Sequence, residues 1–123
     1  MAKITLGFLL SFGSLAVRNK ARCNQSFHEI DEWSPTDWAC AMAGECGEAC
    51  NVIKKLKRLE TEGNSPANAG LDKDDLYRAA ADEIADMVIY ADLLMQRMGM
   101  SLGDAIRSKF NRTSEKVGSG ETL

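Results

Sequence analysis

The chain has 123 residues, of which 45% are hydrophobic and 27% are charged, as is typical of a single globular domain over residues 1–123. Its net charge of −3 gives no general attraction to nucleic acid or to an acidic membrane surface. The single histidine excludes histidine-rich metal sites and the paired Glu-x-x-His motifs of di-iron bundles.

The N-terminal apolar stretch predicts a first amphipathic helix from about Thr5 to Asn24. The run from Ile4 to Val17 is too short to cross a bilayer, and no small-residue cleavage site follows it. We therefore favour a helix over a signal peptide and expect no association with membranes.

Capping residues predict three further helices. Ser34 followed by Pro35 opens a helix that should run to about Glu60, and the glycine-rich, asparagine-rich stretch 61–70 is a loop. Asp72 opens a third helix that should continue to Met98, where Gly99 ends it. A fourth helix should run from Ser101 to about Val117, and we expect residues 118–123 to fray. The predicted fold is an all-α bundle of four helices.

The cysteines indicate the redox compartment. No Cys-x-x-Cys pair is present, which disfavours a structural zinc site. We interpret the thiols as small buried side chains of a protein in the reducing cytoplasm. The residues concerned are Cys23, Cys40, Cys46 and Cys50.

Each of the two long helices carries an apolar stripe at helical spacing that one glutamate interrupts. The first stripe consists of Trp38, Met42, Glu45, Ala49, Val52 and Leu56. The second consists of Leu76, Ala80, Glu83, Met87, Tyr90 and Leu94. A second acid follows each glutamate three residues later, Glu48 after Glu45 and Asp86 after Glu83, so each pair lies on one patch of its helix.

Antiparallel packing of the two helices would bring these four carboxylates together. Since each buried anion loses roughly several kcal/mol of hydration, either some must be protonated or cations must bind among them. Oxygen ligands without nearby histidine favour Mg²⁺ or Mn²⁺. The alternative is that the acids lie on a solvated surface.

Basic and polar residues near these acids are candidates for binding phosphate. Lys55 lies two turns after Glu48 on the same side of its helix, and Lys109 and Asn111 form a second group on the fourth helix. The alternative is that all three are ordinary polar side chains on the solvated surface. No glycine-rich phosphate loop is present.

Several segments together resemble the MazG-type all-α nucleoside triphosphate pyrophosphohydrolases over residues 15–117. The stretch between Glu48 and Glu83 is longer than is usual in that family. The matching segments are Trp33-Ser-Pro-Thr-Asp-Trp38, Gly44-Glu-Cys-Gly-Glu-Ala49, Ile53-Lys-Lys-Leu56, Asp82-Glu-Ile-Ala-Asp86-Met-Val-Ile-Tyr90-Ala-Asp92 and Lys109-Phe-Asn111.

The resemblance implies hydrolysis of a ribo- or deoxyribonucleoside triphosphate to the monophosphate and pyrophosphate, with Mg²⁺ or Mn²⁺ as cofactor. The implied catalytic and metal-binding residues are Glu45, Glu48, Glu83 and Asp86. The implied phosphate-binding residues are Lys55, Lys109 and Asn111. Candidates for contacting the nucleoside are Asn19, Trp33, Trp38 and Tyr90, although a core or capping role would explain each of them as well.

Assembly of more than one chain is also expected. Ile53, Leu93 and Ile106 leave apolar surface away from the two stripes, and the resemblance implies a homodimer or a dimer of dimers. Two alternative functions stay open: an enzyme like phosphoribosyl-ATP pyrophosphohydrolase, and a non-catalytic helical interaction module. The module would not need acids inside its apolar stripes.

Overall fold

A computed structural model describes residues 10–123, and within this part of the chain all regular structure is helical, as the sequence predicts. Two short 3₁₀ turns, η1 (Ile30–Glu32) and η2 (Pro66–Asn68), lie in the connections. The four long helices are α1 (Phe12–Ser26), α2 (Pro35–Glu62), α3 (Lys73–Arg97) and α4 (Leu102–Val117).

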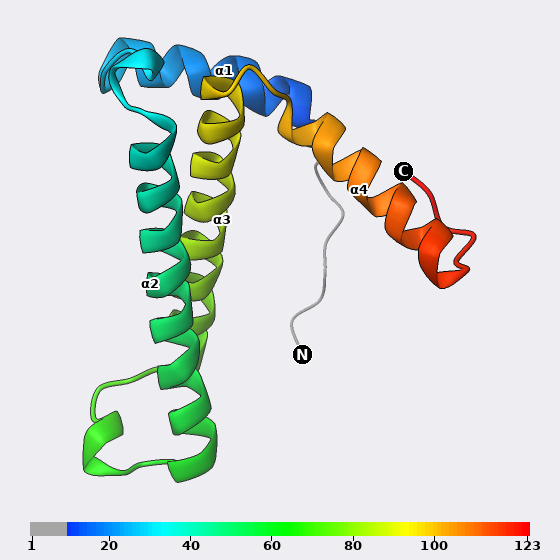
Figure 1. Cartoon of the computed structure of the whole chain (residues 1–123). Coiled ribbons are helices and arrows are strands. Elements are labelled where there is room, and N and C mark those ends of the chain that lie inside the picture. Colours follow the sequence, from blue (N-terminus) through cyan, green and yellow to red (C-terminus); the bar gives the residue numbers. More distant parts are fainter. Residues whose placement is uncertain (1–9) are drawn as a thin grey trace.

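Helices α2 and α3 form a long antiparallel hairpin, which is the main packing unit of the chain (Figure 1). The two predicted stripes face each other: Trp38, Ala49 and Leu56 of α2 are buried, as are Leu76 and Ala80 of α3. Full burial of one large apolar side chain stabilises a fold by roughly 2 kcal/mol, so the stripes hold the hairpin together.

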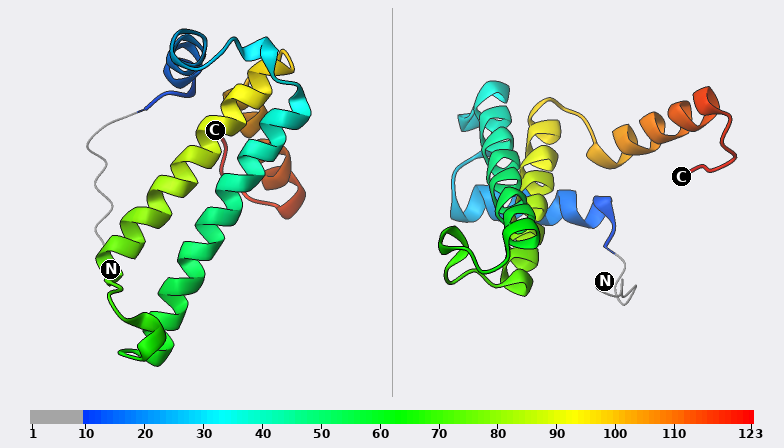
Figure 2. Two further views of the ribbon diagram at one scale, coloured as in Figure 1. Left: turned by 90° about the vertical axis from the view of Figure 1, so that its left-hand side faces the viewer. Right: turned by 90° about the horizontal axis from the view of Figure 1, so that it is seen from below.

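Helix α1 crosses one end of this hairpin (Figures 1 and 2). Asn19 Nδ2 of α1 donates hydrogen bonds to the Ile89 carbonyl and to Asp92 Oδ2 of α3, both at 2.9 Å. Gln96 Nε2 of α3 donates to the Ala16 carbonyl of α1 and to the same Asp92 oxygen, also at 2.9 Å. We call Asn19, Asp92 and Gln96 the α1 clamp, because these three side chains tie α1 to α3.

A buried apolar cluster lies beside the α1 clamp. Cys23, Ile30, Trp38 and Leu93 are buried together. Leu93 was expected to leave apolar surface exposed, and this expectation is wrong: it is 5% exposed, because α1 and η1 cover it. Ile53 does remain exposed.

The start of α1 differs from the prediction. Instead of beginning near Thr5, the helix begins at Phe12, because the hydroxyl of Ser11 accepts a hydrogen bond from the Ser14 amide at 3.0 Å and caps it. Residues 5–9 of the expected helix lie outside the described residues. None of the helices within residues 10–123 has an apolar stretch long enough to span a membrane.

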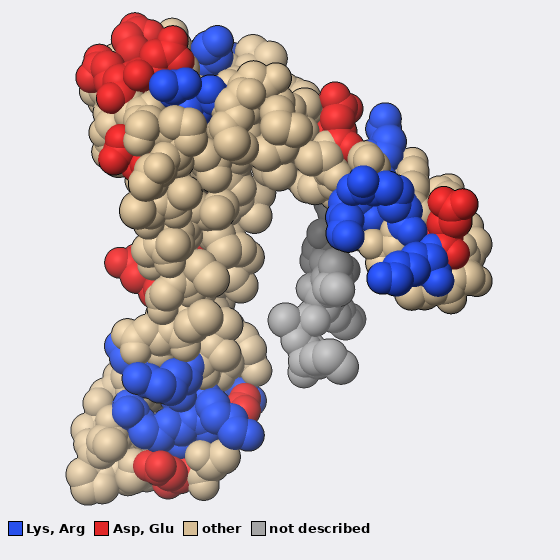
Figure 3. Space-filling model, in the orientation of Figure 1, with Lys and Arg blue, Asp and Glu red and all other residues tan. Residues whose placement is uncertain are grey.

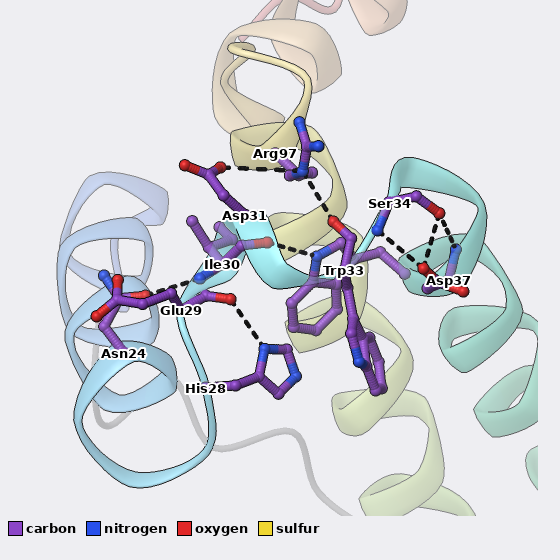
Figure 4. Close-up of polar contacts among 10 residues, drawn as sticks. Asn24, His28, Glu29, Ile30, Asp31, Trp33, Ser34, Asp37 and Arg97 are labelled. Carbon is purple, nitrogen blue, oxygen red and sulfur yellow. Dashed lines mark hydrogen bonds and ion pairs between the residues drawn. The ribbon is translucent and has the colours of Figure 1, made fainter.

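The connection between α1 and α2 is held by side chains at both ends (Figure 4). Asn24 accepts a hydrogen bond from the Ile30 amide at 2.9 Å, and Arg97 Nε donates to the Trp33 carbonyl at 2.8 Å. Ser34 and Asp37 then cap α2 reciprocally as the sequence predicts, and the hydrogen bonds from Ser34 lower the pKa of Asp37.

The remaining helix boundaries lie close to the predicted ones. Helix α2 continues two residues beyond Glu60, α3 ends at Arg97, and α4 ends at Val117. In the loop between α2 and α3, Arg58 Nε donates a hydrogen bond to the buried Asn68 at 2.7 Å.

Helix α4 leads away from the hairpin after its first turns, so the described chain does not close into a four-helix bundle on its own (Figure 1). The tail that was expected to fray instead folds back on α4: the Leu123 amide donates a hydrogen bond to Asn111 Oδ1 at 2.9 Å.

The cysteines also depart from the prediction. Cys23 is buried as expected, but Cys40, Cys46 and Cys50 are exposed. These three thiols lie outside the stripe of α2 that faces α3.

Candidate metal centre and adjoining cavity

Three carboxylates meet at the middle of the α2–α3 hairpin. One oxygen each from Glu45, Glu83 and Asp86 lies within 4.8 Å of the others. Glu45 and Glu83 are half-buried and Asp86 is exposed. The antiparallel packing predicted from the two interrupted stripes therefore brings acids of both helices together.

Glu48 completes the group through Glu83. Hydrogen bonds with Glu45 and Glu48 raise the pKa of Glu83 from its ordinary 4.5 to about 7, since neighbouring carboxyl groups favour a shared proton over several adjacent charges. Together, Glu45, Glu48, Glu83 and Asp86 form what we call the acidic cluster.

The donor atoms of the acidic cluster suit a hard divalent cation. With Mg²⁺–oxygen distances of about 2.1 Å, the ligand oxygens of one octahedral ion lie roughly 3–4 Å apart. The three oxygens of Glu45, Glu83 and Asp86 lie within 4.8 Å of one another, so small side-chain rotations would bring them to such distances. A bound cation would offset the repulsion among these carboxylates that raises the pKa of Glu83, so these residues fit Mg²⁺ or Mn²⁺.

A cavity of about 280 Å³ lies between α1, the connection and the α2–α3 hairpin, next to the acidic cluster. Glu45 and Asp86 line it, so two members of the acidic cluster open directly into this space. All four residues proposed from the sequence to contact a nucleoside also line the cavity: Asn19, Trp33, Trp38 and Tyr90.

Aromatic rings form one wall of the cavity. The ring centroids of Trp33 and Trp38 are 4.7 Å apart, those of Trp38 and Tyr90 are 6.1 Å apart, and His28 lies 4.7 Å from Trp33. Trp38 is also a core residue, which is the alternative role that the sequence left open for it. It is 2% exposed, and its indole N–H donates a hydrogen bond to the Ile30 carbonyl. The rings of this wall that keep exposed surface for an aromatic ligand are therefore the half-buried Trp33 and Tyr90.

Asn19 has both a structural and a cavity-facing position. Its two amide hydrogens are used in the α1 clamp, whereas its side-chain oxygen has no hydrogen-bond partner among the described residues. A ligand in the cavity could therefore only donate a hydrogen bond to Asn19.

The proposed phosphate-binding residues do not line this cavity. Lys55 lies on the same side of α2 as Glu48, and Lys109 is exposed on α4. Asn111 exchanges two hydrogen bonds with the backbone of Leu123. Since α4 leads away from the hairpin, one chain does not bring Lys109 and Asn111 to the acidic cluster.

Sequence reasoning missed Arg22, the one Lys or Arg that lines the cavity among residues 10–123. Its position is readable in retrospect, because Asn19, Arg22 and Cys23 are three and four residues apart and share one face of α1. Arg22 puts a positive charge on the wall of a cavity that also contains Glu45 and Asp86.

Cys23, which the sequence predicted to be a buried thiol, also lines the cavity. Its thiol donates a hydrogen bond to the His28 carbonyl at 3.2 Å, and burial raises its pKa. The thiol is therefore neutral at pH 7 and contributes packing rather than a nucleophile.

Comparison of the chain with protein-family models, with curated proteins and with solved structures gives no match.

Proposed function

We propose that this protein is a divalent-metal-dependent hydrolase of the MazG type, which converts a nucleoside or deoxynucleoside triphosphate to the monophosphate and pyrophosphate. One observation carries the proposal: the acidic cluster opens into an aromatic-walled cavity through Glu45 and Asp86. A helical interaction module would need neither the acids at the seam nor the cavity beside them.

The acidic cluster would hold the metal. Glu45, Glu83 and Asp86 supply the three closest oxygens, and Glu48 reaches the group through Glu83. A bound Mg²⁺ would supply Lewis acidity, offsetting the charge on the phosphate oxygens of the substrate.

In the proposed reaction, a water oxygen attacks the α-phosphorus and the bond from that phosphorus to the bridging oxygen of the β-phosphate breaks. A carboxylate of the acidic cluster accepts the proton of the attacking water. The electron pair of the broken bond leaves with pyrophosphate, whose charge a nearby cation would offset.

The nucleoside would occupy the cavity. The rings of Trp33, Trp38 and Tyr90 would contact the base and sugar, and the free oxygen of Asn19 would accept a hydrogen bond. Arg22, which lines the cavity, would contact phosphate. Lys55 would add charge from the Glu48 side of α2, and Lys109 and Asn111 would require movement of α4 or a second chain.

We also propose that the protein acts as a homodimer, or as a dimer of such dimers. The described chain leaves large apolar side chains exposed on all four long helices, among them Ile53, Ile84 and Phe110. Surfaces of this kind usually mark a protein interface.

The test is a panel of ribo- and deoxyribonucleoside triphosphates with Mg²⁺ or Mn²⁺, scored for monophosphate and pyrophosphate. Hydrolysis in ¹⁸O-water should label the monophosphate, because the α-phosphorus is attacked. Glu83→Gln should lower kcat by at least about a hundredfold, whereas Asp82→Asn, an exposed acid beside it, should not.

Three results would count against the proposal. Label found only in pyrophosphate or free phosphate would place the attack elsewhere. Activity confined to phosphoribosyl-ATP would favour the biosynthetic alternative. No hydrolysis and no Mg²⁺-dependent thermal shift would favour the interaction module.

A further inference from the structure

The orientation of the Asn19 carboxamide on the cavity wall is fixed by its two partners on α3. Asn19 Nδ2 lies 2.9 Å from the Ile89 carbonyl oxygen and 2.9 Å from Asp92 Oδ2. Both partners accept hydrogen bonds, so the nitrogen with its two hydrogens must face them. Half a turn of the carboxamide would set its oxygen against two other oxygens, and the two ends of the group therefore do not exchange places.

The oxygen of this carboxamide is open to the cavity. Asn19 is only 4% exposed, and it lines the cavity. Its oxygen has no hydrogen-bond partner among residues 10–123, yet no buried polar side-chain atom in this part of the chain is both sealed from solvent and unpaired. The oxygen is thus a buried acceptor that a ligand in the cavity can reach.

Asp92 holds Asn19 in this orientation. It is 1% exposed, and its Oδ2 atom accepts hydrogen bonds from both Asn19 and Gln96. Without this oxygen, the Gln96 amide would be free to donate to the Asn19 oxygen, which would withdraw the acceptor from the cavity. Asp92 therefore keeps the two carboxamides apart and keeps the Asn19 oxygen available.

Asp92 does this without a cationic partner. It forms no ion pair within the described part of the chain. On the face that Figure 3 shows, most Lys and Arg side chains gather at the loop end of the hairpin and on α4. A buried carboxylate without a cation adds little stability compared with an apolar side chain packed in its place. Fixing the direction of the Asn19 carboxamide is a role that an apolar side chain could not perform.

The position of Asn19 along α3 indicates which part of a nucleotide it would meet. Its partners Ile89 and Asp92 come three and six residues after Asp86, or roughly 4.5 and 9 Å along the helix axis. Under the proposed function, on which this inference rests, the metal holds the phosphates at Glu45 and Asp86. The base then extends toward Asn19, with the exocyclic substituent at C6 of a purine or C4 of a pyrimidine farthest from the phosphates.

The buried side chains of the cavity wall provide no free donor next to this oxygen. The thiol of Cys23 and the indole N–H of Trp38 already donate to backbone carbonyls, and Leu93 is apolar. Arg22 is exposed, and the proposed function assigns it to phosphate. A base carbonyl that faced Asn19 would therefore meet an acceptor, with no buried donor beside it.

We propose that Asn19, held by Asp92, makes the cavity selective for nucleotides whose base carries an exocyclic amino group at this position, which are those of adenine and cytosine. The amino group donates a hydrogen bond to the Asn19 oxygen. Guanine, hypoxanthine, uracil and thymine carry a carbonyl there, which would leave both oxygens without a donor. Because a site rejects a ligand that leaves its buried polar group unpaired, the preference should be at least about tenfold. Asp92 is a positioning residue, since it acts through Asn19.

The first test measures binding by the quenching of tryptophan fluorescence, because both tryptophans of the chain line the cavity. With Mg²⁺ present, deoxyadenosine monophosphate is compared with deoxyinosine monophosphate, and deoxycytidine monophosphate with deoxyuridine monophosphate. The amino-bearing member should bind at least about tenfold more tightly in each pair whose ring size the cavity accepts. The corresponding triphosphates should show the same preference in kcat/KM.

Three variants separate the positioning of Asn19 from a purely structural role. Asp92→Asn keeps an oxygen that can accept both hydrogen bonds, so it should keep the preference. Asp92→Ala should bring the two members of a pair to within about threefold of each other, because one bond instead of two then holds the Asn19 carboxamide. Gly103→Ala, which should loosen α1 through Phe12 without touching Asn19, is the matched control and should keep the preference.

The ratio within a pair is informative because a loss of folded protein weakens the signal of both members equally. The wild-type comparison tests the base preference even where Asp92→Ala does not fold.

The inference would be overturned by equal binding of the two members to the wild type, by tighter binding of the carbonyl-bearing member, or by no binding of either pair. An unchanged preference in Asp92→Ala, or its loss in Asp92→Asn, would do the same. A preference for the amino-bearing member in binding, without any hydrolysis, would count only against the proposed function. Hydrolysis of both members with equal kcat/KM would count only against this inference.

Discussion

Removing the carboxylate of Asp92 should weaken the attachment of α1 to the hairpin. Asp92 is 1% exposed, and one of its oxygens accepts hydrogen bonds from Asn19 and Gln96, on two different helices. Asp92→Ala deletes both bonds at once and leaves one hydrogen of each amide without its partner.

The cost follows from those two bonds. A hydrogen bond to a charged group contributes about 1.5–3 kcal/mol, so two would contribute about 3–6 kcal/mol. Part of this is offset, because the variant no longer buries a carboxylate and each amide keeps its bond to a backbone carbonyl. We expect a net loss of about 3 kcal/mol in the free energy of unfolding, or roughly 10 °C in Tm for a chain of this length.

The assay is urea denaturation at one fixed protein concentration, together with amide hydrogen exchange. Exchange in α1 should accelerate far more than exchange in the middle of α2 and α3, since the α1 clamp is the polar connection between α1 and the hairpin. Asp82→Ala, at an exposed acid of the same helix, should change stability by less than about 0.5 kcal/mol. A loss below about 1 kcal/mol for Asp92→Ala, or uniform exchange across the helices, would refute the role given to the α1 clamp.

Three further outcomes are expected. In EDTA, the raised pKa of Glu83 means that its protonated form stabilises the fold. This contribution is complete below the unfolded pKa of 4.5 and is lost as the pH rises through about 7. Thermal melts should show this loss of stability, and Glu83→Gln should abolish the pH dependence. Arg22→Ala should raise KM for the nucleotide by about tenfold to a hundredfold in steady-state assays, while a KM unchanged within twofold would exclude a phosphate contact. Gly103→Ala should destabilise the α1–α4 contact in thermal melts, because the new Cβ would lie 2.9 Å from that of Phe12; Gly44→Ala, with open space around it, should instead add about 0.5–1 kcal/mol.

The sequence was sufficient to predict the helices and the seam between α2 and α3. Capping residues such as Ser34 act locally, so they fix where a helix begins without reference to the rest of the chain. The stripes of α2 and α3 were equally readable, because steps of three and four residues define one helix face. From these two signals alone, Glu45 and Glu83 could be expected to meet.

The position of α1 depends on contacts between distant residues, which a single sequence does not reveal. The α1 clamp joins Asn19 to residues about 70 positions later, and no local signal marks Asp92 as its buried centre. The cavity forms only once α1 is in place, and for this reason Arg22 was not recognised from the sequence. The exposed thiols were missed because cysteine is usually buried, and a single sequence does not show which sides of α2 stay uncovered.

The cavity beside the acidic cluster has walls of two separate origins. The hairpin provides Glu45 and Asp86, whereas α1 and the connection provide Asn19, Arg22 and Trp33. Substitutions in residues 12–33 can therefore reshape the space that a ligand enters without moving the carboxylates. Under the proposed function, selectivity and reactivity would be encoded in different stretches of this chain, so the range of accepted nucleotides could be re-engineered through α1 while the hairpin stays unchanged.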